Sequence, residues 1–300
     1  MYPDGTPTIF VNFDTQVKIM DPEAYLKWVN SWRQIPFIPT MDVGYGIWKR
    51  LVHLYSQTRV TKASDKLIAI SGLAKRMRAI MQNEEKFLAG LWSLHLTSQV
   101  LWKVAPNAIG SRIPRWRRPY RAPSWSWVYM PMEESAVPLS AYIVIEEASV
   151  TPRSSLNDTG EAIDGHIRLR GSLIRAELMS SNEEGSRSKM DLWVNGMNTD
   201  SAVSLDEVRL DESYSLVYLP MAGEYDADGD GQAVIGIRAL LLVPVKGKPQ
   251  GWYSRFGFAN TWHDREDPEP MNHLIRVMED RTFNDETLSL EGVPRTIMFL

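Results

Sequence analysis

Apolar residues recur every three or four positions through much of the first hundred residues, the spacing typical of amphipathic helices. Ahead of this pattern, apolar residues alternate within residues 6–20 and predict an extended arm. Asp21-Pro22-Glu23 has the composition of a helix start, and an apolar stripe from Tyr25 to Trp32 follows it and stops before Pro36. The spacing predicts a helix over this stretch.

Three further helices are predicted by the same spacing. The first runs from Tyr45 to Gln57, and the second begins near Ser64 or Asp65 and continues past Met77. The third covers about Glu84 to Trp102, where apolar positions at Phe87, Leu88, Leu91 and Trp92 suggest one buried face.

Beyond residue 132 the pattern changes to short β-rich runs separated by loops of Gly, Asn, Asp and Ser. Gly171, inside one of these runs, predicts a bend or bulge, and residues 180–190 and 262–272 are expected to be loops. Helices followed by strands define an α+β fold whose β part is a sandwich or barrel. The predicted strands span 141–150, 166–178, 191–194, 214–219, 233–243, 252–258 and 296–300. The predicted parts are an extended arm (1–20), a helical subdomain (21–110), an Arg/Trp strap (111–132) and an antiparallel β subdomain (133–300).

The strap holds the most unusual run of the chain, Arg-Arg-Pro-Tyr-Arg-Ala-Pro-Ser-Trp-Ser-Trp at 117–127. Its two prolines favour extended backbone over helix. In an extended segment Trp125 and Trp127 would share one face. The run therefore predicts a stiff segment that presents aromatic area beside arginine donors.

The 300 residues include eleven tryptophans and no cysteine, which excludes disulfides and thiolate chemistry. The N-terminus lacks the features of a signal peptide, and the longest apolar run is too short to span a bilayer, so a cytoplasmic protein without a membrane partner is expected. Residues 1–132 carry 18 Lys and Arg against 8 Asp and Glu, whereas the remainder carries 15 against 29. The two halves would attract one another electrostatically, or they simply differ in surface composition.

Several segments occur in an order that resembles the region following the HET domain of fungal heterokaryon-incompatibility proteins. They are Ile47-Trp48, Tyr55-Ser56, Arg59-Val60-Thr61, residues 65–74 and 87–92, Leu101-Trp102, and residues 118–127. The resemblance covers about eighty residues, and the β-rich remainder is similar more loosely. The HET domain itself, which resembles TIR-like signalling folds, is absent from this sequence. The resemblance therefore implies a C-terminal HET-like region and transfers no catalytic residue.

The strap and its aromatic neighbours form the candidate site. Aromatic walls would stack a hydrophobic or anionic small molecule, arginines would bind its anionic oxygens, and a histidine or aspartate would carry a proton. The alternative is structural: the tryptophans join the two halves and the arginines pair with acids. The candidate ligand-binding residues are Trp92, Trp102, Arg118, Tyr120, Arg121, Trp125 and Trp127, and the candidate catalytic residues are His95 and Asp65.

Other chemistries have less support. The arginines of the strap suggest phosphate contacts, but the chain is acidic overall and has no recognised nucleic-acid motif, so no nucleic-acid partner is expected. Residues 226–231 match only the first half of a calcium loop, and an acidic hairpin turn explains them more simply. No histidine spacing typical of a metal site occurs, and no metal or cofactor is expected. His95, within the predicted 84–102 helix, would be either a buried general base or a core residue, and Asp65 would be either a proton carrier or a helix cap.

Two hypotheses follow. The first is a small-molecule-binding HET-like protein, with a cofactor-independent cyclase or isomerase of fungal specialised metabolism as its enzymatic form. The second is a non-enzymatic interaction or regulatory module derived from heterokaryon-incompatibility proteins, which holds a protein partner.

Overall fold

A computed structural model describes residues 41–58, 62–81, 85–104, 120–129, 132–133, 140–180, 190–206, 214–225, 234–264, 266–279 and 294–300. All of them belong to one compact unit, residues 41–300. The predicted arm at 6–20, the predicted helix after Asp21, Arg118 and the acidic 226–231 segment lie outside the described residues.

The first two helices of the described chain match the predicted pattern. Helix α2 spans Met41–Ser56 and buries Tyr45, Trp48 and Val52 along one face. A 3-10 turn, η1 (Ala63–Asp65), leads into helix α3, which spans Lys66–Met81. Burial of one apolar stripe on each helix explains why spacing alone predicted both.

The predicted helix at 84–102 is wrong. This stretch forms a small hairpin of β1 (Phe87–Leu88) and β2 (Leu91–Trp92), followed by the single-turn helix α4 (Leu96–Gln99). Ala89 and Gly90 turn the chain with φ of 46° and 106°, values that a right-handed helix excludes. Every residue of the two strands is buried. Their apolar residues, at 87, 88, 91 and 92, therefore have the spacing of a buried helix face although no helix forms.

The β part is one eleven-stranded sheet in the order β10-β9-β8-β12-β13-β14-β15-β7-β6, with β11 beside β14 and β5 beside β12. All pairings are antiparallel except the short parallel contact between β14 and β15. Among the described strands the sheet ends at β10 and β6, so it is not a closed barrel. Its strands are β5 (Ser140–Ala141), β6 (Val144–Pro152), β7 (Ala162–Ser172), β8 (Ile174–Ser180), β9 (Met190–Val194), β10 (Met197–Asn198), β11 (Ala202–Leu205), β12 (Tyr214–Tyr225), β13 (Val234–Pro244), β14 (Trp252–Trp262) and β15 (Pro294–Phe299).

The predicted loop at 262–272 is partly wrong, because it contains the start of helix α5 (Glu269–Glu279). The proline-bearing run before the helix is its cap: Asp267 Oδ1 accepts a hydrogen bond from the Glu269 amide at 3.3 Å. Met271 and Leu274, three positions apart, are buried against the sheet.

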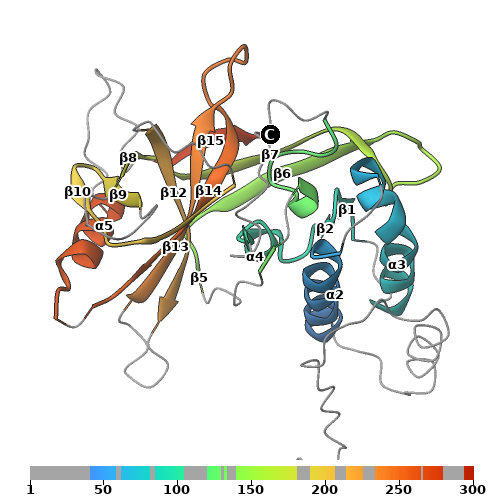
Figure 1. Ribbon diagram of the computed structural model, residues 1–300, viewed down its shortest axis with the longest axis horizontal. Coiled ribbons are helices and arrows are strands. Elements are labelled where there is room, and N and C mark those ends of the chain that lie inside the picture. The colour runs from blue at the N-terminus through green and yellow to red at the C-terminus, as the bar shows by residue number, and fades with distance from the viewer. Residues whose placement is uncertain are drawn as a thin grey trace, which may run out of the picture. The chain divides into compact units, whose positions relative to one another are not determined.

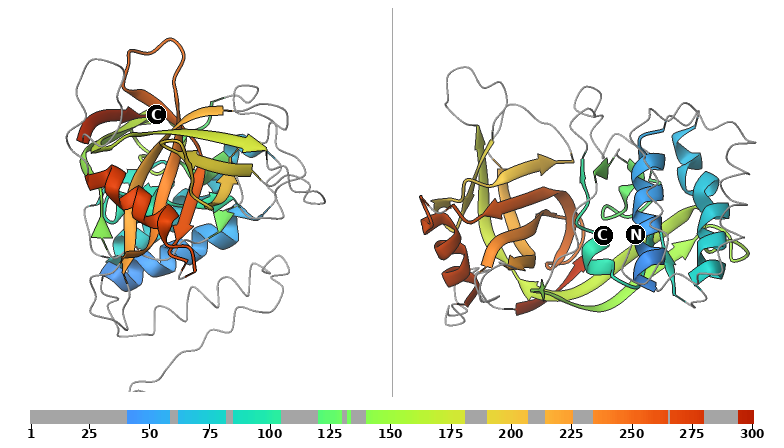
Figure 2. Two further views of the ribbon diagram at one scale, coloured as in Figure 1. Left: turned by 90° about the vertical axis from the view of Figure 1, so that its left-hand side faces the viewer. Right: turned by 90° about the horizontal axis from the view of Figure 1, so that it is seen from below.

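Two hydrophobic clusters lie on the two faces of the sheet. One contains residues of α2, α3, the β1–β2 hairpin, the strap and strands β7, β12, β13, β14 and β15. The other contains α5 with strands β8, β9, β12, β13 and β14. Helices α2 and α3 lie at the opposite end of the sheet from α5, and the β6–β7 hairpin extends toward α3 (Figures 1 and 2). The α+β class is therefore confirmed, with a hydrophobic cluster on each face of the sheet.

The hairpin between β6 and β7 is fastened to α3. Ser71 Oγ lies 2.7 Å from Thr159 Oγ1 and donates to Asn157 Oδ1 at 3.0 Å, and Arg78 pairs with Asp158 at 2.9 Å. Gly171, expected at a bend, instead lies within β7 where a Cβ would come within 2.8 Å of an Ile143 methyl. The break in this long strand falls at residue 173, between β7 and β8.

Candidate ligand pocket and the strap that walls it

Residues 120–129 of the strap are compact rather than extended. The Ser126 amide donates to the Pro123 carbonyl at 3.0 Å, which closes a turn, and Trp127–Tyr129 form a 3-10 turn, η4. Trp125 and Trp127 are both 0% exposed. The expectation that the two indoles share a face of an extended segment is therefore wrong, because the backbone turns between them.

Gly90 receives the tryptophan side chains of two distant segments. Its carbonyl accepts the indole N–H of Trp127 at 2.9 Å and that of Trp48 at 3.2 Å. Ser126 Oγ donates to the neighbouring Ala89 carbonyl at 2.6 Å. A Cβ at Gly90 would lie 2.5 Å from the Trp127 nitrogen, so only glycine permits this approach. The β1–β2 turn thus joins α2 to the strap.

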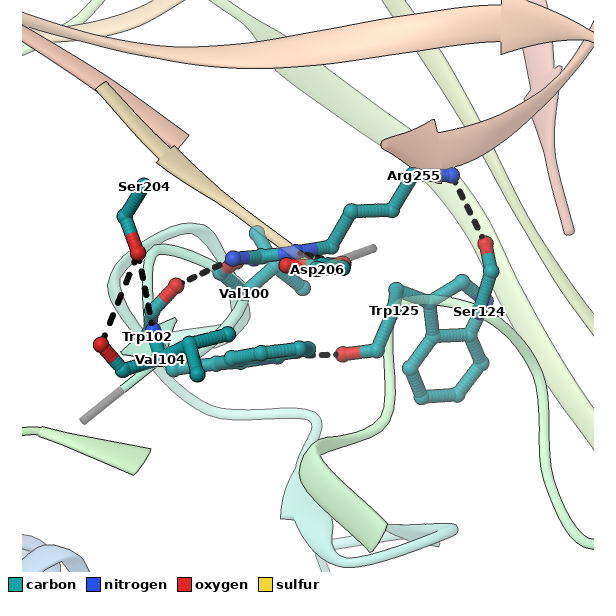
Figure 3. Close-up of polar contacts among 8 residues, drawn as sticks. All are labelled: Val100, Trp102, Val104, Ser124, Trp125, Ser204, Asp206 and Arg255. Atoms are coloured by element: carbon teal, nitrogen blue, oxygen red, sulfur yellow. Dashed lines mark hydrogen bonds and ion pairs between the residues drawn. The ribbon is translucent and has the colours of Figure 1, made fainter. Parts of the chain in front are cut away.

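A buried ion pair at the sheet contacts the segment that contains Val100 and Trp102 (Figure 3). Arg255 of β14 donates from Nε to Asp206 Oδ2 at 2.9 Å, and both side chains are 0% exposed. The two terminal guanidinium nitrogens donate to the carbonyls of Val100, at 2.6 Å, and of Trp102. The guanidinium carbon also lies 3.5 Å from the centre of the Trp102 ring.

At Arg255, none of the described strands pairs with one side of β14. β15 pairs with β14 at residues 252–253 and β11 pairs at residues 257–260. Between them, the Arg255 amide donates to Ser124 Oγ at 2.9 Å (Figure 3). One residue from the Ser124 side chain, the Trp125 carbonyl accepts the Trp102 indole N–H at 2.8 Å. The strap therefore provides a hydrogen-bond acceptor, Ser124 Oγ, for the backbone N–H of Arg255 in β14.

Trp102, which stacks against Arg255, also lines a pocket bounded by α2, the β1–β2 hairpin, α4 and the strap. The pocket has a volume of about 20 Å³, enough for roughly one water molecule. Most of the lining is apolar, and Lys49, Ser98 and Gln99 contribute polar groups. The lining residues are Tyr45, Trp48, Lys49, Val52, Gly90, Leu91, Ser98, Gln99, Trp102 and Trp127.

Two of the predicted site residues line this pocket, and two more pack against residues of its lining. Trp102 and Trp127 line it directly. The Trp92 ring packs edge-on against that of the lining residue Trp48, with centroids 5.6 Å apart. His95 packs against Tyr45, another lining residue, at 5.0 Å.

Other predicted residues lie elsewhere. Trp125, Tyr120 and Arg121 are not part of the pocket lining. Trp125 is buried in the core beside the pocket, Tyr120 is 50% exposed and Arg121 is half-buried.

Neither candidate proton carrier lines the pocket. His95 is exposed, not a buried base, and its φ of 55° places it at the turn before α4, because the predicted helix around it does not form. Asp65 ends η1 immediately before α3, and its carboxylate accepts a hydrogen bond from Ser64 Oγ at 3.0 Å. Asp65 does not line the pocket.

Sequence reasoning missed Lys49 as a pocket residue and missed the Arg255–Asp206 pair. A signal existed for the lysine, since it adjoins Trp48 on a predicted amphipathic helix. The ion pair joins residues 49 positions apart and depends on the sheet register, so no local pattern marks it.

Burial changes the acidity of three groups in the described chain. It raises the pKa of Tyr55, whose hydroxyl donates to the Lys66 carbonyl, and nearby Asp65 raises it further. Burial also raises the pKa of Tyr218 in the sheet and lowers that of the Arg238 guanidinium. None of these three residues lines the pocket.

Searches of the part of the chain that the structure describes give two further results. No cluster of three or more His, Asp or Glu residues suited to hold a metal ion occurs there. None of its helices is long and apolar enough to cross a lipid bilayer.

Comparisons with family models, with curated proteins and with solved structures returned no match to this chain.

Proposed function

We propose that this chain is a HET-like protein that binds a small molecule at the pocket between α2, α4 and the strap. The observation that carries the proposal is that Trp102 and Trp127 line one pocket, while Trp92 and His95 pack against two other residues of its lining. Aromatic walls with a few polar groups at the rim are typical of ligand sites. The resemblance to the region after the HET domain agrees with this proposal, because the resembling segments supply the walls.

The size of the pocket limits the ligand. A volume of about 20 Å³ takes one small group, not a whole drug-sized molecule. The ligand would insert a terminal group between Trp48 and Trp102 and lie across the mouth. Lys49 adds a positive charge to the lining, so a carboxylate or phenolate oxygen at the mouth is favoured.

An enzymatic form of this proposal assigns the proton transfer to His95. The exposed imidazole packs against Tyr45 at the pocket rim and would exchange protons with solvent and with a bound ligand. A cyclisation or isomerisation needs little more than orientation and one such group. Replacing His95 with Gln would then abolish conversion of the ligand while leaving its retention unchanged.

The proposal is tested by a substitution that fills the pocket with a larger side chain. Ser98→Trp places a bulky ring in the lining, whereas Ser155→Trp makes the same change at an exposed position of the β6–β7 hairpin. Native mass spectrometry after incubation with a small-molecule extract of the source organism should show a compound retained by the native chain and by Ser155→Trp. Ser98→Trp should lose it. Retention by both variants would contradict the proposal.

A charge test identifies the class of ligand. Lys49→Gln should weaken retention of an anionic compound about tenfold, while Lys75→Gln on the exposed face of α3 should leave it unchanged. Benzoate, titrated into both variants, serves as a defined probe of the anionic group. Equal affinities for benzoate would exclude Lys49 as the anion contact.

The interaction module remains the second candidate, and exposed apolar side chains favour it. Leu156, in the β6–β7 hairpin, is 93% exposed, and Ile68 on α3 is 49% exposed. The hairpin and α3 are joined through Ser71 and Thr159, so both belong to one connected part of the fold. Large exposed apolar side chains mark protein contacts when they form a contiguous patch.

This candidate predicts a specific partner that depends on those side chains. A protein that co-purifies with the native chain should be lost from the Leu156→Ser variant. Val144→Ser, a similar change at a 52% exposed strand residue, is the matched control. Equal recovery of the partner with both variants would exclude the hairpin surface.

A further inference from the structure

The geometry points to Arg255 and Asp206 as positioning residues for the pocket, which they hold in shape from outside it. The inference rests on the proposed ligand site, because it concerns the walls of that site. Neither residue lines the pocket, yet Arg255 contacts segments that supply walls on two of its sides.

The first contact fixes the wall formed by residues 98–102. Arg255 donates to the carbonyls of Val100 and Trp102, and its guanidinium stacks on the Trp102 ring at 3.5 Å (Figure 3). Ser98, Gln99 and Trp102 all line the pocket and lie within five consecutive residues. Holding the carbonyls and the ring at once leaves this short segment little freedom to shift.

The second contact fixes the strap. The Arg255 amide donates to Ser124 Oγ, three residues before the lining residue Trp127. The Trp102 indole N–H then donates to the Trp125 carbonyl, which ties the two walls to each other. Arg255 of β14 therefore fixes the positions of both walls relative to the sheet.

Asp206 keeps the Arg255 side chain in place. The carboxylate accepts from Nε, and this leaves both terminal nitrogens directed at the two carbonyls. A buried ion pair is not by itself more stabilising than a well-packed apolar pair of similar volume. Its value here is geometric, because the planar guanidinium reaches a carboxylate, two carbonyls and an indole at once.

Arg255→Lys separates the charge from the geometry. Lysine keeps the positive charge opposite Asp206, but its compact ammonium cannot span both carbonyls and cannot stack as a plane. The 98–102 wall should then open more often while the sheet stays folded. Loss of about one buried hydrogen bond corresponds to an increase of about tenfold in the open population.

The chain contains no cysteine, so one introduced cysteine reports on one position. Val100→Cys reports opening of the wall, since Val100 is 1% exposed. Val217→Cys makes the same change at a 5% exposed position of β12 and reports unfolding of the sheet. Labelling by 5,5′-dithiobis(2-nitrobenzoate) is then followed for each cysteine variant, with and without the Arg255→Lys substitution.

With Arg255→Lys we expect labelling at position 100 to rise about tenfold and labelling at position 217 to rise far less. Equal increases at both positions, or no increase at position 100, would overturn the inference. If Arg255→Lys fails to fold, the double variant Arg255→Met/Asp206→Leu removes both buried charges together, and the same two outcomes apply to it.

The labelling does not depend on what the pocket binds. If Arg255→Lys raises labelling equally at positions 100 and 217, the positioning role is refuted even if the native chain retains a ligand. If labelling rises at position 100 and not at position 217, but the native chain retains no ligand in the mass-spectrometry experiment, the positioning role stands and the proposed function is refuted.

Discussion

Replacing Gly90 with alanine tests the idea that the β1–β2 turn joins α2 to the strap. The new methyl would lie 2.5 Å from the Trp127 indole nitrogen and 2.9 Å from its neighbouring ring carbon. Those ring atoms belong to a side chain that is 0% exposed, and the pocket that it lines has a volume of only about 20 Å³. The backbone of Gly90 also has φ of 106°, a region that alanine adopts only with strain.

The expected cost combines three effects. Holding alanine at this positive φ costs about 1–3 kcal/mol. Displacing a buried ring costs about 1–3 kcal/mol, since overpacked cores relax only in part. Loss of the 2.9 Å hydrogen bond from Trp127 to the Gly90 carbonyl adds about 1 kcal/mol. Because these effects overlap, we expect a total of about 4 kcal/mol, a large share of the 5–15 kcal/mol typical of a folded domain.

The assay is urea unfolding followed by tryptophan fluorescence, with Gly72→Ala as the control. Gly72 lies on the exposed side of α3 with nothing within 4 Å of an added Cβ, so alanine should stabilise the chain by about 0.5–1 kcal/mol. The two identical substitutions should therefore change stability in opposite directions. A Gly90→Ala variant within 1 kcal/mol of the native chain would refute the packing described for Trp127 and the turn.

Three further predictions concern single contacts. Ser126→Ala should lower the free energy of unfolding by about 1–3 kcal/mol, because the buried Ala89 carbonyl loses its 2.6 Å donor; unchanged urea midpoints would contradict this. Thr159→Val should cost about 1 kcal/mol and speed amide hydrogen exchange in the β6–β7 hairpin, since the 2.7 Å contact with Ser71 is lost; native exchange rates would exclude that anchoring role. Burial raises the pKa of Tyr218 above the ordinary 10.0, so the unfolded chain releases this proton first, and stability should fall as pH rises above 10. Tyr218→Phe should flatten that decline in pH-dependent thermal melts, and an unaltered slope would argue against it.

Much of the fold follows from local patterns. The α2 and α3 helices each bury one apolar stripe, so spacing located them. The seven predicted strands overlap strands of the sheet, but the prediction at 166–178 covers parts of both β7 and β8, and β10 and β11 were not predicted. Spacing failed at 84–102, where both faces of a short hairpin are buried and Gly90 reverses the chain. It also missed α5, because the aspartate and prolines before this helix are equally typical of a loop.

The candidate site was predictable only in its aromatic part. Trp92, Trp102 and Trp127 stood out because tryptophans are rare and cluster near the strap, and the fold does gather them. Trp125 does not line the pocket, because the backbone turns after Pro123. The prediction of an extended strap placed Trp125 and Trp127 on the same face. The Arg255 contacts depend on a gap between β15 and β11 along β14, a feature of tertiary pairing that no sequence window contains.

The most direct test of the account is ligand retention measured by native mass spectrometry on three proteins: the native chain, Ser98→Trp and Ser155→Trp. Each is incubated with the same small-molecule extract, which is profiled before and after. The pocket proposal predicts a compound retained or converted by the native chain and by Ser155→Trp, and lost from Ser98→Trp, whose lining is filled. A compound retained equally by all three, or by none, would contradict a ligand site between α2 and the strap.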